Sequence, residues 1–468
     1  MIAKNKKRLE ISLLICWIAT LLSINSNLYG VEYTDYQILS IKKNLLLFNY
    51  LRFYLPFITI IFLLSLFFFI KKKFNLVLCA FFFYFFYQLI LLFVLNNDIN
   101  ERVYTVLGEK IKNYQLVVNA ISTLLIFYYS NIIKFKDFYK NLLIITITFI
   151  GFISIFFCVQ LMWEFFSKKE TYYFYVSNAL AAEQLSLLQA NPRITGLSRM
   201  ILLIFFLFYF INISNLKIKL IKYFSSIVLF SCIFFIYGMQ SRGSWIGVLL
   251  LIFLNILFYK EKIRKKILTL IILIFLPIIT FHLFIKIKNY YLTEVTQKEK
   301  VESTQNLAKN QERLSSNYTT SGRTEIWRNI ISIVKEEKII LGKGPQSDRY
   351  LLTKYIDKNK NIINFQIYEN NASNAILYSY LCGGIFGLFI IIFLYINFAY
   401  IIYKITFVKR IFFKNNILLN FSIVTLSYLL IRSIFENSFS LFSIDFMILI
   451  LCYFIISETN NKLLRKIN

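Results

Sequence analysis

Residues 50–70 read YLRFYLPFITIIFLLSLFFFI, residues 71–73 read KKK, and residues 74–95 read FNLVLCAFFFYFFYQLILLFVL. Each apolar stretch matches the roughly 20 residues that a helix needs to cross the hydrocarbon core of a bilayer. The three lysines leave room only for a tight connection between two antiparallel helices. Because stretches of this kind recur along the whole chain, the sequence predicts an all-α membrane protein.

The chain has 468 residues, 58% of them hydrophobic, with only 4 prolines and 13 glycines to interrupt the apolar blocks. About twelve blocks are long and apolar enough to cross a bilayer as helices. The predicted spans are 11–25, 50–70, 74–95, 114–133, 141–166, 197–214, 221–240, 244–259, 267–287, 374–400, 416–433 and 436–457. Residues 1–287 then hold spans one to nine, residues 288–373 form one large loop, and residues 374–468 hold the last three spans.

The basic residues predict the orientation of the chain. In a soluble protein a formal net charge of +28 would suggest a nucleic-acid partner. Here the lysines and arginines concentrate in short segments on one side of the predicted spans, as expected for cytoplasmic loops. These segments are Lys4–Arg8, Lys71–Lys73, Lys134–Lys140, Lys217–Lys222, Lys260–Lys266, Lys404–Lys414 and Lys462–Lys466. The alternation predicts cytoplasmic termini, places the 288–373 loop outside, and leaves no need for a nucleic acid.

The cysteines and the histidine do not point to a metal site. All six cysteines fall inside apolar blocks without a C-x-x-C pattern, and His282 is the single histidine of the chain. We expect the cysteines to pack as small apolar side chains, without disulfides, a metal or a cofactor.

The large loop carries a helical pattern. Apolar residues recur at helical spacing within residues 323–338, which predicts an amphipathic helix there. Leu341–Pro345 contains two glycines and a proline and ends that helix, and a further short helix is predicted at 347–357. A long loop with such a pattern is usually functional. A second outside loop covers residues 167–196.

Four arginines lie near the predicted outer face. Arg193 and Arg199 are at the mouth of span six, Arg242 is in the short turn before span eight, and Arg323 opens the loop helix. A charge at membrane depth is costly and usually faces a cavity or a partner. The guanidinium group suits phosphate, although an arginine there can also reach the lipid headgroups. The sequence leaves both readings open.

Span ten begins and continues with residues of other kinds. Ser373 and Asn374 precede it, and they either cap its helix or hydrogen-bond a polar ligand such as a sugar. The glycines that follow, at 383, 384 and 387, allow close approach of another helix. Few acids are available as a general base, and the sequence does not choose among Glu164, Glu183, Glu325, Asp348 and Glu369.

At these residues the sequence resembles the O-antigen ligase and O-antigen polymerase superfamily of bacterial envelopes. The resemblance rests on the order and spacing of several short motifs over roughly residues 190–400. These are Arg193-x-x-Gly196, Ser241-Arg242-Gly243, Gly322-Arg323-x-x-Ile326-Trp327, Leu341-Gly342-x-Gly344-Pro345, Ser373-Asn374 and Gly384-Ile385-x-Gly387.

The resemblance implies a metal-independent glycosyltransferase at the periplasmic face of the bacterial inner membrane. Its substrate would be a glycan on undecaprenyl pyrophosphate in the lipid bilayer, and its partners a flippase and a chain-length regulator. An acceptor hydroxyl attacks the sugar carbon that bears the pyrophosphate, and cationic side chains stabilise the leaving charge. We carry over Arg242 and Arg323 as catalytic and Arg193 as substrate-binding, and we add Arg199 and the Ser373–Asn374 pair as binding candidates.

One departure separates the branches of the superfamily. Members of the ligase branch that this sequence resembles have His-Asn at the end of the loop, and their histidine is proposed to activate the acceptor. Here that position reads Ser373-Asn374, and a serine without a partner is a poor base. This favours a polymerase of O-antigen or another surface polysaccharide, and keeps as alternatives a ligase that transfers glycan to lipid A-core or protein, and a lipid-linked glycan flippase or transporter. A flippase should carry charges deep in several spans, and the predicted spans hold few.

Overall fold

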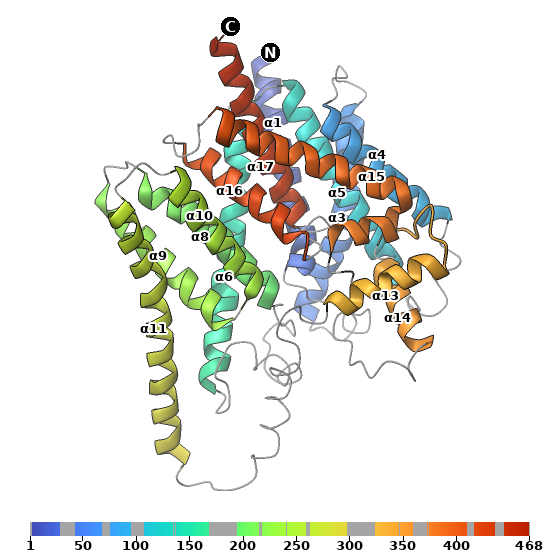
Figure 1. Ribbon diagram of the computed structural model, residues 1–468. Coiled ribbons are helices and arrows are strands. Elements are labelled where there is room, and N and C mark those ends of the chain that lie inside the picture. Colours follow the sequence, from blue (N-terminus) through green and yellow to red (C-terminus); the bar gives the residue numbers. More distant parts are fainter. Residues whose placement is uncertain are drawn as a thin grey trace.

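The computed structural model shows a bundle of helices (Figure 1). It describes residues 2–28, 43–67, 75–94, 107–133, 135, 137–167, 194–214, 218–239, 241–258, 263–296, 323–345, 347–358, 372, 374–409, 416–435 and 444–467, which contain no β-strand. The helices are α1 (Ile2–Leu28), α3 (Lys43–Phe67), α4 (Leu76–Val94), α5 (Leu107–Ile133), α6 (Phe138–Ser167), α8 (Ile194–Ile213), α9 (Lys219–Gly238), α10 (Arg242–Phe258), α11 (Ile263–Thr296), α13 (Arg323–Glu336), α14 (Ser347–Lys358), α15 (Ala375–Tyr403), the π-helical turn η1 (Lys404–Val408), α16 (Ile417–Arg432) and α17 (Ile444–Ile467).

Each of the twelve predicted spans overlaps a helix. Five helical segments are long and apolar enough to cross a membrane by length and composition, and they are Leu76–Val94, Phe138–Trp163, Gly196–Ile213, Lys219–Gly238 and Ala375–Val408. Shorter apolar helices occur at Tyr54–Leu66, Val117–Ile133, Arg242–Phe258 and Ile417–Arg432. The chain is therefore an integral membrane protein, and the number of twelve spans stays a prediction.

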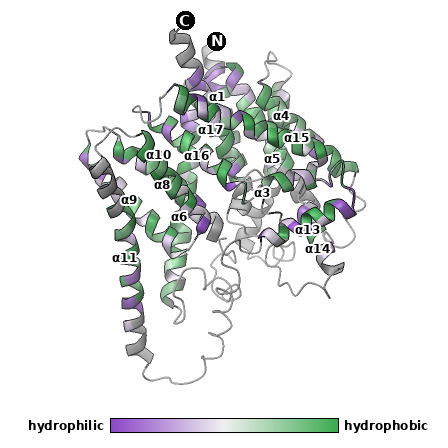
Figure 2. Ribbon diagram, viewed as in Figure 1, coloured by the Kyte–Doolittle hydropathy of each residue, from purple (hydrophilic) through white to green (hydrophobic). Residues whose placement is uncertain are grey.

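Most helices of the bundle consist largely of hydrophobic residues, as Figure 2 shows. Large hydrophobic side chains face outward, and Leu220, Phe152 and Ile61 are 77%, 76% and 69% exposed. Water would penalise such exposure at about 25 cal/mol per Å² of apolar surface, whereas lipid tails are as apolar as the side chains themselves.

The last helices of the chain join two groups of earlier ones. Helices α1, α3, α4 and α5 pack against one another, and α8 packs against α6, α9 and α10. Between these groups, α15 packs on α4, α16 on α8 and α10, and α17 on α1, α5 and α6. All side chains from Ile444 to Ile456 in α17 are buried, so this helix lies in the core of the bundle.

Both chain termini lie at one end of the bundle, and α13 and α14 lie at the other (Figure 1). We call the second end the loop end, and we call α13, α14 and the turn Leu341–Pro345 between them the loop module. Helix α13 confirms the predicted amphipathic helix and buries Ile326, Ile330 and Ile333. Helix α14 confirms the second predicted helix. Helix α11 runs on to Thr296, beyond the residue 287 at which we expected the loop to begin.

Candidate functional site

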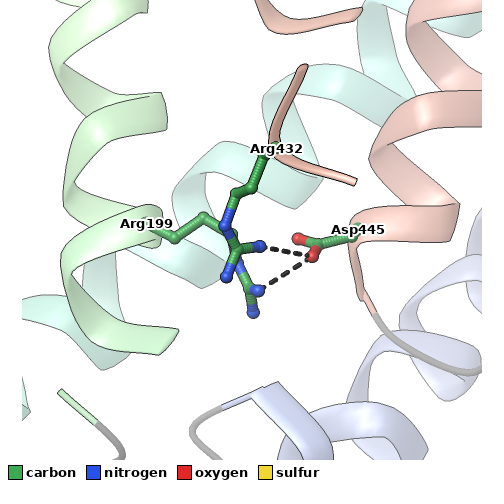
Figure 3. A network of polar contacts seen from close by, with 3 residues as sticks. All are labelled: Arg199, Arg432 and Asp445. Atoms are coloured by element: carbon green, nitrogen blue, oxygen red, sulfur yellow. Dashed lines mark hydrogen bonds and ion pairs between the residues drawn. The ribbon is translucent and has the colours of Figure 1, made fainter. Parts of the chain in front are cut away.

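A buried cluster of two arginines and one aspartate lies at the loop end (Figure 3). Arg199 Nη1 and Arg432 Nη1 lie 2.8 Å and 3.1 Å from the same oxygen, Asp445 Oδ2. The side chain of Asp445 is 1% exposed, that of Arg432 is 5% exposed, and that of Arg199 is 11% exposed. Two positive charges and one negative charge leave the cluster with a formal charge of +1 in a place that water scarcely reaches.

Three helix ends bring these residues together. Arg199 lies in the second turn of α8, Arg432 is the last residue of α16, and Asp445 is the second residue of α17. A cation at a helix C-terminus and an anion at a helix N-terminus both match the helix dipole. The positions of Arg432 and Asp445 are therefore favourable for the helices that carry them as well as for the ion pair.

Arg242 lies beside this cluster. It is the first residue of α10, and its side chain is exposed. The next residue is Gly243, and a methyl group at that position would lie 3.8 Å from Arg432 Nε. The preceding residue, Ser241, accepts hydrogen bonds at its carbonyl from Ser244 N and Trp245 N, at 3.1 Å and 3.2 Å. The start of α10 is thus well defined, and it places the predicted Arg242 one residue before Gly243, which lies close to Arg432 of α16.

Gly247 permits the close packing that brings α10 to this place. A methyl group there would lie 2.4 Å from Leu202 Cδ2 of α8 and 3.0 Å from the ring of Tyr428 of α16. The Ser-Arg-Gly segment and the glycine that follows it therefore have different tasks. The first places a charge at the loop end, and the second lets α10 approach its neighbours.

Asn374 ties the beginning of α15 to the end of α16. Its Oδ1 accepts hydrogen bonds from Ile376 N and Leu377 N, at 2.9 Å and 3.0 Å, which caps the helix. Its Nδ2 donates to Ile434 O at 2.9 Å, one residue after the Ser433 carbonyl that accepts from the backbone of α15. The structure thus gives Asn374 a capping role, and substrate binding by this side chain stays a prediction.

The turn Leu341–Pro345 inserts into a break in α15. The helix is interrupted at Gly384, where φ is 59° and ψ is −150°. Backbone hydrogen bonds of 2.9 Å run from Lys343 N to Leu381 O, from Gly344 N to Cys382 O and from Ile385 N to Ile340 O. The turn thereby satisfies carbonyl groups that the interrupted helix cannot satisfy itself.

Glycine is required where the two backbones meet. A methyl group at Gly384 would lie 2.1 Å from Ile340 O, and one at Gly342 would lie 2.5 Å from Cys382 O. The expected approach of another helix is confirmed at Gly383 and Gly387, where a methyl group would lie 3.0 Å from Gln88 Nε2 and 3.4 Å from Tyr84 Cε2 of α4, whereas at Gly384 the partner is the turn of the loop module. Tyr380 OH, which donates to Ile339 O at 2.9 Å, and Tyr87 OH, which donates to Leu341 O, hold the same turn.

Arg323 is the first residue of the loop module and is partly buried at the start of α13. The module packs against the first half of α15, so Arg323 lies at the same end of the bundle as Arg242. The contacts around Asp445 that Figure 3 draws do not include it. Two further predicted residues, Arg193 and Ser373, lie outside the described residues.

Of the acidic residues proposed as a general base, the structure describes the side chain of Asp348. Asp348 is 1% exposed, and its Oδ2 accepts a hydrogen bond of 2.9 Å from Ala372 N. This contact ties the start of α14 to the residue that leads into α15, which is a structural task. The side chains of Glu164, Glu183, Glu325 and Glu369 lie outside the described residues. His282 is exposed on α11 and lies 2.7 Å, through its Nε2, from Tyr237 OH of α9.

Reasoning from the sequence missed Asp445 and Arg432. Both are charged residues within predicted spans, at 416–433 and 436–457, and this signal could have identified them, because charges in membrane spans are rare and usually functional.

Comparison with known families finds a match that covers only part of the candidate site. Residues 227–392 match the family model described as O-antigen ligase, so this part of the chain is similar to that family. The match covers roughly a third of the chain and includes Arg242, Arg323 and the broken part of α15. Arg199, Arg432 and Asp445 lie outside it. No curated protein matches the chain.

Proposed function

We propose that this chain belongs to the O-antigen ligase and polymerase superfamily and is a membrane glycosyltransferase that polymerises undecaprenyl-pyrophosphate-linked repeat units at the periplasmic face of the inner membrane. One observation carries the proposal, namely the pair of Arg199 and Arg432 that share Asp445 at the loop end, with Arg242 preceding Gly243, which lies close to Arg432. Members of the superfamily act on lipid-linked glycans, and such a substrate brings an anionic pyrophosphate to the surface of the membrane.

The chemistry follows from the charges. The acceptor hydroxyl forms a new C–O bond at the sugar carbon, the bond from that carbon to the pyrophosphate oxygen breaks, and the leaving group takes the electron pair. The hydroxyl proton is released in the same reaction. Arginine holds phosphate oxygens through paired N–H donors, and cations fixed in a site of low dielectric stabilise the charge that grows on the leaving group.

The start of α15 supports a polymerase over a ligase. The position of the ligase histidine is occupied by Ser373, and the next residue, Asn374, is engaged as a helix cap. His282 packs with Tyr237 between α9 and α11 and not at the start of α15. An acceptor that is itself a lipid-linked glycan suits a site without this histidine. Transfer to lipid A-core or to protein is the second candidate.

A flippase is a weaker candidate because of where the charges lie. A passage for a polar glycan should be lined with polar and charged groups along its length. In the part of the chain that the structure describes, the buried ion pairs gather at the helix ends around Asp445. The charges therefore suit a reaction at one membrane face better than transport across the membrane.

The proposal is tested by glycan ladders on lipopolysaccharide gels. Arg242→Ala and Arg323→Ala should each abolish long chains while single repeat units remain attached. Arg328→Ala is the matched control, since Arg328 is an exposed arginine on the same helix as Arg323, and it should leave the ladder intact. Normal ladders from both Arg242→Ala and Arg323→Ala would contradict the catalytic reading. Loss of all attached glycan in a deletion strain would indicate a ligase instead.

A further inference from the structure

We infer that Asp445 is a positioning residue, which holds Arg199 and Arg432 as a pair beside Arg242. The inference rests on the proposed function and adds a residue to it. Its basis is the shared contact, in which one carboxylate oxygen receives both guanidinium groups at 2.8 Å and 3.1 Å. The three residues come from three helices (Figure 3), so the carboxylate fixes two side chains that the backbone alone would not bring together.

Electrostatics gives the carboxylate this role. Two guanidinium groups that are both removed from water repel each other strongly, because the interaction of charges grows as the local dielectric falls. A carboxylate between them replaces that repulsion by two attractions. Without it, the arginines gain by separating, by turning toward water or by recruiting another anion.

The net positive charge of these three residues favours an anionic substrate. The formal charge of the cluster is +1, and Arg432 also lies against Gly243, the neighbour of the exposed Arg242. An anionic group that arrives at Arg242 therefore meets a site whose two other cations are already held close together. Such preorganisation spares the substrate the cost of ordering these side chains.

A purely structural role makes a different prediction. Asp445 is in the first turn of α17, where any acid favours the helix dipole. If that were its only task, its removal would weaken the fold independently of Arg432. Positioning instead predicts that Asp445 and Arg432 act as one unit, so that the second substitution adds little after the first. A double-mutant cycle separates these cases.

The experiment uses the full-length protein in membranes and compares Asp445→Asn, Arg432→Gln and the double variant. The rate of chain elongation is measured as a function of the concentration of lipid-linked repeat units, which gives kcat and KM, and the amount of inserted protein is measured alongside. Each single substitution should lower kcat/KM at least tenfold, and the double variant should lie within about twofold of Arg432→Gln. Asp445→Glu should regain part of the activity. Glu337→Gln, which breaks the exposed pair of Glu337 with Lys354, should match the unaltered protein.

Several results would overturn the inference. It fails if Asp445→Asn elongates normally, if the losses of the two single variants multiply in the double variant, or if the double variant regains full activity merely because its charge is balanced. If Asp445→Asn does not accumulate, the Asp445→Glu and double variants decide by the same criteria. The proposed function has its own test in Arg242→Ala. Activity lost in Arg242→Ala but kept in Asp445→Asn overturns the role of Asp445 alone, whereas activity kept in Arg242→Ala overturns the proposed site.

Discussion

Replacement of Gly384 by alanine should release the loop module from the bundle. The backbone angles at Gly384, φ 59° and ψ −150°, are nearly restricted to glycine, so an alanine costs roughly 1–3 kcal/mol in strain. Its methyl group would lie 2.1 Å from Ile340 O and 2.4 Å from Leu341 C, and the turn would have to move away. That movement breaks three backbone hydrogen bonds, each worth about 0.5–1.5 kcal/mol. The sum is about 2.5–7.5 kcal/mol, or a shift of roughly 10²- to 10⁵-fold toward the undocked turn.

Cys382 offers a direct assay for this undocking. Its side chain is 0% exposed, and its carbonyl oxygen accepts one of the hydrogen bonds from the turn. In a variant that keeps only this cysteine, Gly384→Ala should speed labelling by a thiol reagent at least 100-fold. Gly151→Ala in α6 is the control, because nothing lies within 4 Å of a methyl group there. Equal labelling rates in the two variants, within about twofold, would refute the idea that Gly384 keeps the turn docked.

Three further predictions concern packing and charge. Tyr380→Phe removes the hydrogen bond to Ile339 O, worth about 1 kcal/mol, and should speed labelling of the same cysteine roughly fivefold; an unchanged rate would mean that this bond does not hold the turn. Gly247→Ala overpacks α10 against α8 and α16 and should lower the free energy of unfolding by about 1–3 kcal/mol, measured as a lower unfolding temperature in detergent. An unchanged temperature would show that the neighbouring side chains can move to make room for the methyl group. Asp445→Asn leaves two buried arginines without their carboxylate and should lower the free energy of unfolding by about 3–5 kcal/mol. Glu337→Gln breaks an exposed ion pair and should lower it by only about 0–1 kcal/mol. Similar denaturant midpoints for these two variants would contradict this difference.

The sequence alone predicted where the helices lie but did not predict all of their ends. Long apolar blocks leave a membrane chain little choice other than helix, because unpaired backbone groups are costly in lipid, and every predicted span overlaps a helix. Helix α11 extends to Thr296 because no glycine or proline stops it where its apolar block ends. The break in α15 was harder to foresee. The glycines indicated a close approach, but no local pattern shows that the approaching group is a backbone turn from the preceding loop.

The sequence predicted arginines at this end of the bundle, including Arg199, but it did not identify Arg432 and Asp445 as members of the site. The short turn before α10 predicted Arg242 at the membrane boundary; the structure shows the residue exposed at the start of α10, and its depth in the membrane stays a prediction. The pairing of Arg199 with Asp445 could not be foreseen in the same way, because the two residues come from helices far apart in the chain. For Asn374 the sequence identified the residue but did not decide its role. Capping and ligand binding ask for the same side-chain chemistry, and only the hydrogen bonds to Ile376 N and Leu377 N show the cap.

The break in α15 also bears on how the protein is made. The turn Leu341–Pro345 leaves the ribosome before its docking site around Gly384 exists. During synthesis the loop module must therefore wait, with its backbone donors bonded to water, until α15 has been completed and placed against α4. Docking of the turn then becomes a late step in biogenesis, because it requires the completed α15.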